Sequence, residues 1–139
     1  MEVFQTVAQL KPARIWDGVL SRVLNAERLT IGFVDLDPNI QVPEHTHENE
    51  QVGFVLRGTI TMVIAGQAQK LGVGSTYTIH SNVPHSAKTG PDGASVVDVF
   101  APVRADWDKA PRLEPFPGRW PEGPHPDPPP RAGEETMLN

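Results

Sequence analysis

Large apolar side chains at every second position in the middle of the chain limit most what it can fold into. In Thr59–Ala65 (TITMVIA), the larger apolar residues Ile60, Met62 and Ile64 occupy every second position. This period of two is that of a β-strand and differs from the 3.6 of a helix. Other short apolar runs predict further strands at Trp16–Leu24, Arg28–Leu36, Gln51–Arg57, Ser75–Ile79 and Ser95–Phe100. Such runs, separated by Gly, Pro and Asn, favour an all-β sandwich or barrel.

Two glycines and one short polar segment predict what lies between and after these strands. Gly58 and Gly66 flank the alternating segment and are expected at turns. Asp106–Ala110 is expected to form a single helical turn, because the prolines that follow it stop a longer helix. Sheets of this kind have edges that need a partner, and Trp16–Leu24 is predicted to pair with a neighbouring subunit.

Prolines divide the chain into two parts. Nine of the fifteen prolines lie after position 110, where few aliphatic residues occur. Proline lacks the N–H that a strand or helix interior requires. We therefore predict a β-domain over residues 1–110 and an extended or partly disordered tail over residues 111–139 that cannot join a ladder. Phe116 and Trp120 are expected to anchor the first half of that tail on the domain.

Charge and composition argue against several classes of protein. The formal net charge is −5 and no basic run exceeds two residues, so neither nucleic acid nor an acidic membrane surface is expected as a partner. No apolar stretch approaches the roughly 20 residues that span a bilayer. The N-terminal residues show no secretory pattern, and there is no cysteine. We therefore expect a cytoplasmic protein that acts on a small molecule.

Histidines in two distant segments predict a metal site. His45 and His47 are two positions apart, so in an extended strand they point to the same side. Gln51 keeps the same parity, and His85 lies beside another strand that a barrel can bring close. Three imidazoles and an amide oxygen suit a divalent zinc, nickel, manganese or iron ion. Ligands from one side only would leave open positions for water or substrate.

These residues resemble the two motifs of the cupin family. His45–Gly58 is similar to the first motif, an HxH pair followed by Glu (in some branches Gln) and then Gly, and Gly74–His85 resembles the second. The resemblance implies a double-stranded β-helix, or jelly roll, with the metal in its mouth, and a homodimer. Gln51 stands where Glu is commoner, which leaves the ion with its full charge. His80 replaces a usual proline and either lines the pocket or caps a strand.

A third segment resembles one branch of the family. Asp98–Asp106 (DVFAPVRAD) is similar to the ending of cupins that linearise 4,5-unsaturated uronates from pectin and alginate, giving a keto sugar acid. The resemblance implies that Asp98 transfers a proton, Arg104 binds the substrate carboxylate through two hydrogen bonds, and Phe100 walls the pocket. Asp98 and Phe100 share parity on their strand, so both are expected to face the interior.

Other interpretations remain open at this point. The same metal set would serve a dioxygenase or a cyclase acting on an aromatic or polyketide precursor, although a Glu ligand is commoner there. A non-catalytic barrel that binds a small molecule is a third reading. In that case Asp98 and Arg104 would form a structural ion pair, and Phe100 would belong to the core.

Overall fold

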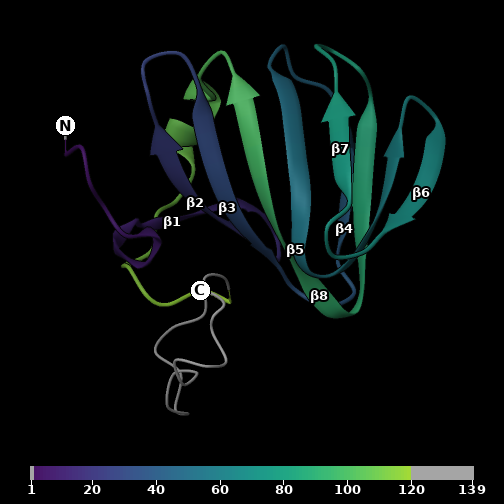
Figure 1. Ribbon diagram of the computed structural model, residues 1–139, viewed down its shortest axis with the longest axis horizontal. Helices are drawn as coiled ribbons and strands as arrows, with labels where there is room; N and C mark the ends of the chain where they lie inside the picture. The colour runs from purple at the N-terminus through teal and green to yellow at the C-terminus, as the bar shows by residue number, and fades with distance from the viewer. Residues whose placement is uncertain (1, 120–139) are drawn as a thin grey trace, which may run out of the picture.

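A computed structural model describes residues 2–119, and most of them lie in β-strands (Figure 1). The strands are β1 (Pro12–Trp16), β2 (Val19–Asn25), β3 (Thr30–Leu36), β4 (Gln41–His45), β5 (Glu50–Ile64), β6 (Gln67–Leu71), β7 (Thr76–Ile79) and β8 (His85–Ala101). Two 3₁₀ turns, η1 (Val7–Gln9) and η2 (Ala105–Lys109), precede and follow them. The second of these confirms the helical turn predicted after the last strand.

Two long strands, β5 and β8, form the centre of the fold and take part in both of its layers. The first half of β5 pairs with the second half of β8, and this layer continues through β3, β2 and β1 on one side and β7 on the other. The second half of β5 pairs with the first half of β8, with β6 and β4 beside them. This is the predicted double-stranded β-helix, closed on itself as a jelly roll.

Apolar side chains from both layers fill the interior. The alternation in β3 buries Thr30, Gly32, Val34 and Leu36 and leaves the residues between them partly exposed. From the other layer Ile60 packs into the same core, as the period of two predicts. One end of this interior stays open and polar, and the candidate site lies there.

Gly58 is not at a turn, in contrast to the prediction. It lies within the continuous strand β5, where the register with β8 shifts on either side of it. Its φ of +74° and the backbone oxygen of Gly93, against which a Cβ would collide, both require glycine. A bulge therefore bends the strand from one layer into the other. Gly66, with a φ of +79°, does occupy the turn between β5 and β6.

The predicted strand Trp16–Leu24 is wrong in its extent and in its partner. A turn at Asp17 and Gly18 divides it, and the φ of Gly18 is +80°. The second part, β2, pairs with β1 and β3 of the same chain, so it does not offer a free edge to another subunit. Within residues 2–119, no helix is long and apolar enough to cross a bilayer.

The first residues of the tail lie against the barrel. Arg112 forms an isolated β-bridge with Ala13 of β1, so this residue contacts the sheet without extending a ladder. Phe116 anchors the tail, because its ring lies 4.9 Å from the guanidinium of the buried Arg22 and its carbonyl accepts a 2.8 Å hydrogen bond from it. Trp120, the second predicted anchor, lies outside the described residues, as does the rest of the tail.

Candidate metal centre

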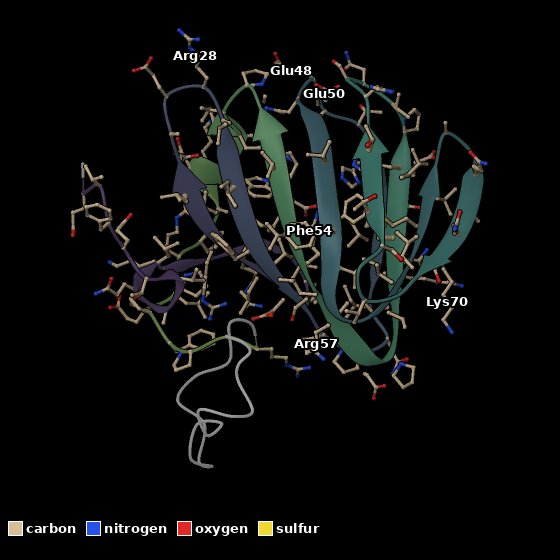
Figure 2. All side chains as sticks on the ribbon, viewed as in Figure 1. Arg28, Glu48, Glu50, Phe54, Arg57 and Lys70 are labelled. Atoms are coloured by element: carbon tan, nitrogen blue, oxygen red, sulfur yellow. The ribbon has the colours of Figure 1, made fainter. Side chains whose placement is uncertain are left out.

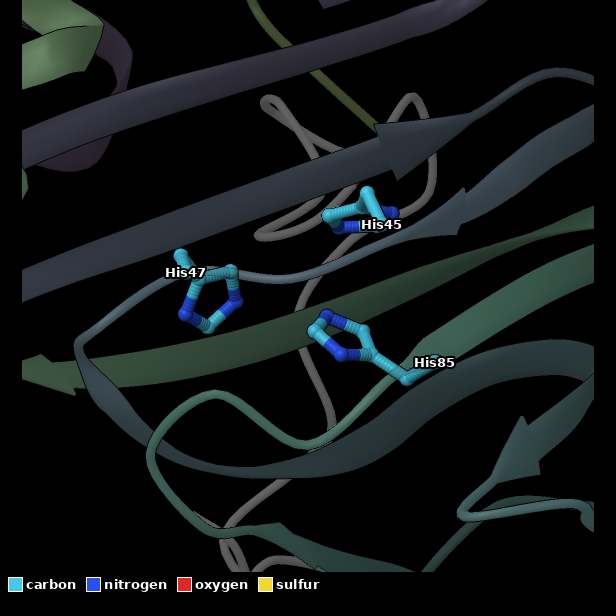
Figure 3. Close-up of side chains that lie close together, drawn as sticks. All are labelled: His45, His47 and His85. Atoms are coloured by element: carbon cyan, nitrogen blue, oxygen red, sulfur yellow. The ribbon is translucent and has the colours of Figure 1, made fainter.

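Three histidines meet at the open end of the barrel, and Figure 3 shows their rings turned toward a common centre. His45 is the last residue of β4 and pairs in register with His85, the first residue of β8. His47 follows two residues later, in the turn before β5, so it is not on the strand as predicted but still joins the cluster. One ligand atom from each of the three lies within 4.8 Å of the others.

Each imidazole is held by a backbone carbonyl two residues away along the chain. The Nδ1 atoms of His45, His47 and His85 lie within hydrogen-bond distance of the carbonyl oxygens of Pro43 (2.8 Å), Asn49 (2.9 Å) and Val83 (2.9 Å). A carbonyl can only accept, so Nδ1 carries the proton and Nε2 keeps its lone pair. Such bonds are the usual support of metal-binding histidines.

The contact between His47 and Gln51 tests whether a cation fits here. Nε2 of His47 lies 3.1 Å from Oε1 of Gln51. With Nδ1 of His47 protonated, two lone pairs face each other across this gap unless a positive charge lies between or beside them. The donor set of three imidazole nitrogens and one amide oxygen therefore fits a divalent metal ion. Gln51 is buried, with 6% of its surface exposed.

Burial favours the neutral form of His85 and His47, which a metal requires. Burial, helped by the charges of the neighbouring histidines and Arg104 and opposed by the bond to Val83, lowers the pKa of His85 from 6.5 to about 4. Burial also lowers the pKa of His47, with Arg104 adding to the effect. Neutral imidazoles need not lose a proton before binding a metal near neutral pH.

Asp98 lies beside the metal-ligand set and is buried, with 8% of its surface exposed. Its Oδ1 accepts a 2.6 Å hydrogen bond from the hydroxyl of Tyr77. Burial raises the pKa of Asp98 from 3.8 to about 6, although hydrogen bonds from Tyr77 and Gln51 and the charge of Arg104 oppose the rise. Burial and the nearby carboxylate also raise the pKa of Tyr77 well above 10. A carboxyl group that titrates near neutral pH is suited to acid–base catalysis.

Arg104 does not form the structural ion pair with Asp98 that one reading of the sequence predicts. Its carboxylate partner is Asp106, which accepts bonds of 3.0 Å from Nε and 2.9 Å from Nη2. The guanidinium also lies 4.7 Å from the ring centre of Phe100 and 4.4 Å from that of Trp107. Its Nη1 makes no hydrogen bond within residues 2–119, so one donor edge stays available to a ligand.

A cavity of about 430 Å³ connects these groups to solvent. The histidines and Gln51 line it together with Asp98 and Phe100, as the strand alternation predicts. Arg14 and Lys109, both exposed, lie on its lining nearer the surface. Together with Arg104 they give the cavity three cationic side chains, against the two carboxyl groups of Asp98 and Asp106 that also line it. The cations outnumber the carboxyl groups, and this balance favours anionic ligands.

Comparison with known proteins identifies the fold family. Residues 32–100 match the Cupin_2 family of cupin domains. The chain carries a cupin domain. The pectin degradation protein KdgF of Dickeya dadantii (strain 3937) is 31% identical over 64 residues, which are 45% of this chain and 58% of that protein. The aligned part is therefore less than two thirds of that relative. This similarity confirms the resemblance to a branch of cupins that degrades pectin.

Solved structures confirm the jelly roll of this cupin. An RmlC-like cupin from Shewanella frigidimarina NCIMB 400 has a TM-score of 0.71 at 25% identity, over 77% of this chain and 96% of that chain. The structure of KdgF from Halomonas sp. has a TM-score of 0.69 at 21% identity, over 76% of this chain and 98% of that chain. At this identity the second similarity is one of fold alone.

The structure also shows site residues of this cupin that sequence reasoning missed. Tyr77 was placed only in a strand, yet its hydroxyl binds Asp98. Trp107 lies under the guanidinium of Arg104 and meets the ring of Phe100 edge to face, and its position after the last strand gives no sign of this role. His80 was expected either to line the pocket or to cap a strand. Its side chain is largely exposed, its Nδ1 lies 3.4 Å from Oε2 of Glu50, and it does not line the cavity.

Proposed function

We propose that this cupin is a metal-dependent enzyme that acts on a small sugar acid, most concretely an unsaturated uronate that it opens and converts to a keto sugar acid. The observation that supports this most is the placement of Asp98, a buried carboxyl with a pKa of about 6, beside a three-histidine cluster in one cavity. An acid–base group and a Lewis-acid site within one pocket are what a tautomerisation needs.

The metal would be held by the Nε2 atoms of His45, His47 and His85 and by Oε1 of Gln51. A bound zinc, nickel, manganese or iron ion would supply Lewis-acid polarisation of hydroxyl or carboxylate oxygens of the sugar. Because Gln51 is neutral, the protein ligands leave the ion its full double charge, in contrast to a set that contains Glu. The Nδ1 bonds to backbone carbonyls orient the three rings before any metal arrives.

Asp98 would move the proton. Opening of the ring breaks the bond between the anomeric carbon and the ring oxygen. The anomeric hydroxyl loses its proton and becomes an aldehyde, and the ring oxygen gains a proton and becomes the hydroxyl of an enol at the existing double bond. The Asp98 carboxylate accepts the enol O–H proton and returns it to the neighbouring carbon, so the enol becomes a ketone and the carboxylate is restored. Tyr77 holds Oδ1 of this group at 2.6 Å and so fixes the carboxylate at the wall of the cavity.

Arg104 and Phe100 would position the substrate. Asp106 already occupies Nε and Nη2 of Arg104, so the predicted two-bond contact with a carboxylate is replaced by a single contact through Nη1. The guanidinium lies over the rings of Phe100 and Trp107, which keep it in place and make this side of the cavity apolar. Arg14 and Lys109 would then favour anionic substrates on their way in.

The test is a turnover assay with the purified, metal-loaded protein. Unsaturated uronate made with a polysaccharide lyase is added, and proton NMR follows the loss of the vinyl signal and the growth of the keto product. We expect turnover with and without oxygen, and a loss of at least about 100-fold in Asp98→Asn at equal metal content. No acceleration over the uncatalysed reaction would refute the proposal.

The same experiment separates the alternatives. Turnover of an aromatic or polyketide precursor that stops under anaerobic conditions would identify a dioxygenase. Ligand binding that is unchanged in Asp98→Asn, with no turnover of any uronate, would identify a non-catalytic binding protein. Elemental analysis of the protein as purified identifies the metal in each case.

We further propose that the protein is cytoplasmic and forms a homodimer through the outer face of the layer that contains the first half of β5. Figure 2 shows Phe54 standing on this face of β5. Phe54 and its neighbour Val52 are 40% and 44% exposed, which is high for large apolar side chains on a central strand. Contiguous exposed apolar groups on a sheet favour contact with another protein surface.

A further inference from the structure

We propose that Asp98 is a positioning residue, which turns the side-chain amide of Gln51 so that its oxygen faces the metal site. Tyr77 holds Asp98 in place across Gly53, and these three residues form what we call the clamp. The inference rests on the proposed metal site but assigns a role that the proton transfer does not require. It concerns the orientation of a ligand, and this can be measured without any turnover.

Three neighbouring strands place the three residues of this clamp in one row. Tyr77 of β7 is in register with Gly53 of β5, and Gly53 is in register with Asp98 of β8. Tyr77 and Asp98 are thus two strand spacings apart, roughly 10 Å between backbones. A Cβ on Gly53 would collide with Oδ1 of Asp98 and with the ring of Tyr77. The missing side chain on the central strand is what lets the hydroxyl reach the carboxylate.

The carboxylate in turn decides which way the Gln51 amide points. The side chain of Gln51 hydrogen-bonds Asp98 and thereby lowers the pKa of that carboxyl, so the group that Gln51 offers is a donor, its NH₂. The amide oxygen then points the other way, and it lies 3.1 Å from Nε2 of His47. Without Asp98, either end of the amide could face the histidines, and an NH₂ there would repel a cation.

This arrangement also explains why position 51 holds glutamine where related motifs more often hold glutamate. A glutamate would place a second carboxylate against Asp98 in a buried cavity, where neither could donate a hydrogen bond unless it were protonated. Gln51 instead satisfies Asp98 with its donor and the metal site with its acceptor. The neutral side chain of Gln51 and the buried acid Asp98 therefore depend on each other.

The test measures metal affinity by competition with a chromogenic chelator, using manganese or zinc on the metal-free protein. We expect Asp98→Asn to weaken binding by about tenfold or more, because asparagine offers a donor as well as an acceptor and no longer dictates the orientation of the amide. Asp35→Asn is the matched control, since Asp35 is also partly buried and bonded to Ser95 and Arg22 but lies on the other side of the sheet. It should leave metal affinity unchanged.

A second experiment, which moves the carboxylate from position 98 to position 51, gives the sharper result. Gln51→Glu alone should weaken metal binding, although carboxylates are ordinarily stronger ligands, and adding Asp98→Asn should restore it. If Gln51→Glu alone binds metal more tightly than the wild type, or if Asp98→Asn in the folded protein binds it equally well, the proposed role of Asp98 is wrong. Circular dichroism of each variant confirms that it is folded.

A spectroscopic readout separates this inference from the proposed function. In the metal-free protein, the side-chain NH₂ of Gln51 should show a slowly exchanging proton by nitrogen-edited NMR. Tyr77→Phe should shift this signal and speed its exchange, and Thr78→Val, the neighbouring change on the opposite face of β7, should not. An unprotected NH₂ in the wild type would overturn the inference. The expected signal in a protein without uronate turnover would uphold it and refute only the proposed function.

Discussion

Metal-free protein should lose stability through His85 when the pH falls from 8 to 5. The pKa of His85 is lowered to about 4 in the fold from the 6.5 of an exposed histidine. Between these two values the unfolded chain binds a proton that the folded one does not, so the stability from this residue is present above pH 6.5 and is lost toward pH 4. At pH 5 the loss is on the order of 2 kcal/mol.

Asp98 should act in the opposite direction over the same range. Its pKa is raised from 3.8 to about 6, so the folded state binds a proton between these values that the unfolded state does not. Burying the ionised carboxylate therefore lowers the free energy of unfolding most at pH 8, and at pH 5 the protein is more stable by about 1 kcal/mol through this group. The wild-type profile alone would hide both effects, because the two partly cancel.

Differences between variants separate the two groups. Urea unfolding with a metal chelator present, at pH 8 and pH 5, gives the stability of the wild type, His85→Gln and Asp98→Asn. On acidification, the wild type should lose stability relative to His85→Gln and gain it relative to Asp98→Asn. His80→Gln, a change at a largely exposed site, is the control. If the two differences move in the same direction, the reasoning from burial is refuted.

Three further predictions follow from the site and from the outer face of the sheet. Metal at 100 times its dissociation constant should stabilise the wild type by about 2.7 kcal/mol in a thermal or urea melt, and His45→Ala should largely abolish this gain. Arg104→Lys should raise the KM for an unsaturated uronate by about tenfold with a smaller effect on kcat, because lysine lacks the planar group that stacks on Phe100 and Trp107. Phe54→Asp should give a monomer in light scattering with unchanged metal affinity.

The strands were predictable where the pattern of side chains is local. The alternation in Thr59–Ala65 depends only on which residues face the core, and the structure buries Ile60 and Met62 as expected. Gly58 was misplaced because a positive φ serves a turn and a bulge equally well. Whether a turn or a bulge forms at Gly58 depends on its pairing with β8. The paired segment of β8 lies some 35 residues further along the chain.

The histidines of the site were predictable, and their surroundings were not. The spacing of His45 and His47 and the second motif around His85 are visible in the sequence. The role of Tyr77 depends on the register of three strands, which no local pattern specifies. Arg104 found its partner two residues away in Asp106, because the 3₁₀ turn that starts at Ala105 brings the two side chains together.

The site therefore depends on two kinds of structure that should fail separately. The imidazoles are oriented by carbonyls within two residues of each histidine, so their geometry survives changes elsewhere in the barrel. The unit of Gln51, Asp98 and Tyr77 depends instead on the register of β5 between β7 and β8. A slip of one residue in that register would turn Gln51 to the outer face and bring Glu50 inward. Gly58 and its bulge set that register, so the strand that bends the barrel also determines which side chain completes the metal site.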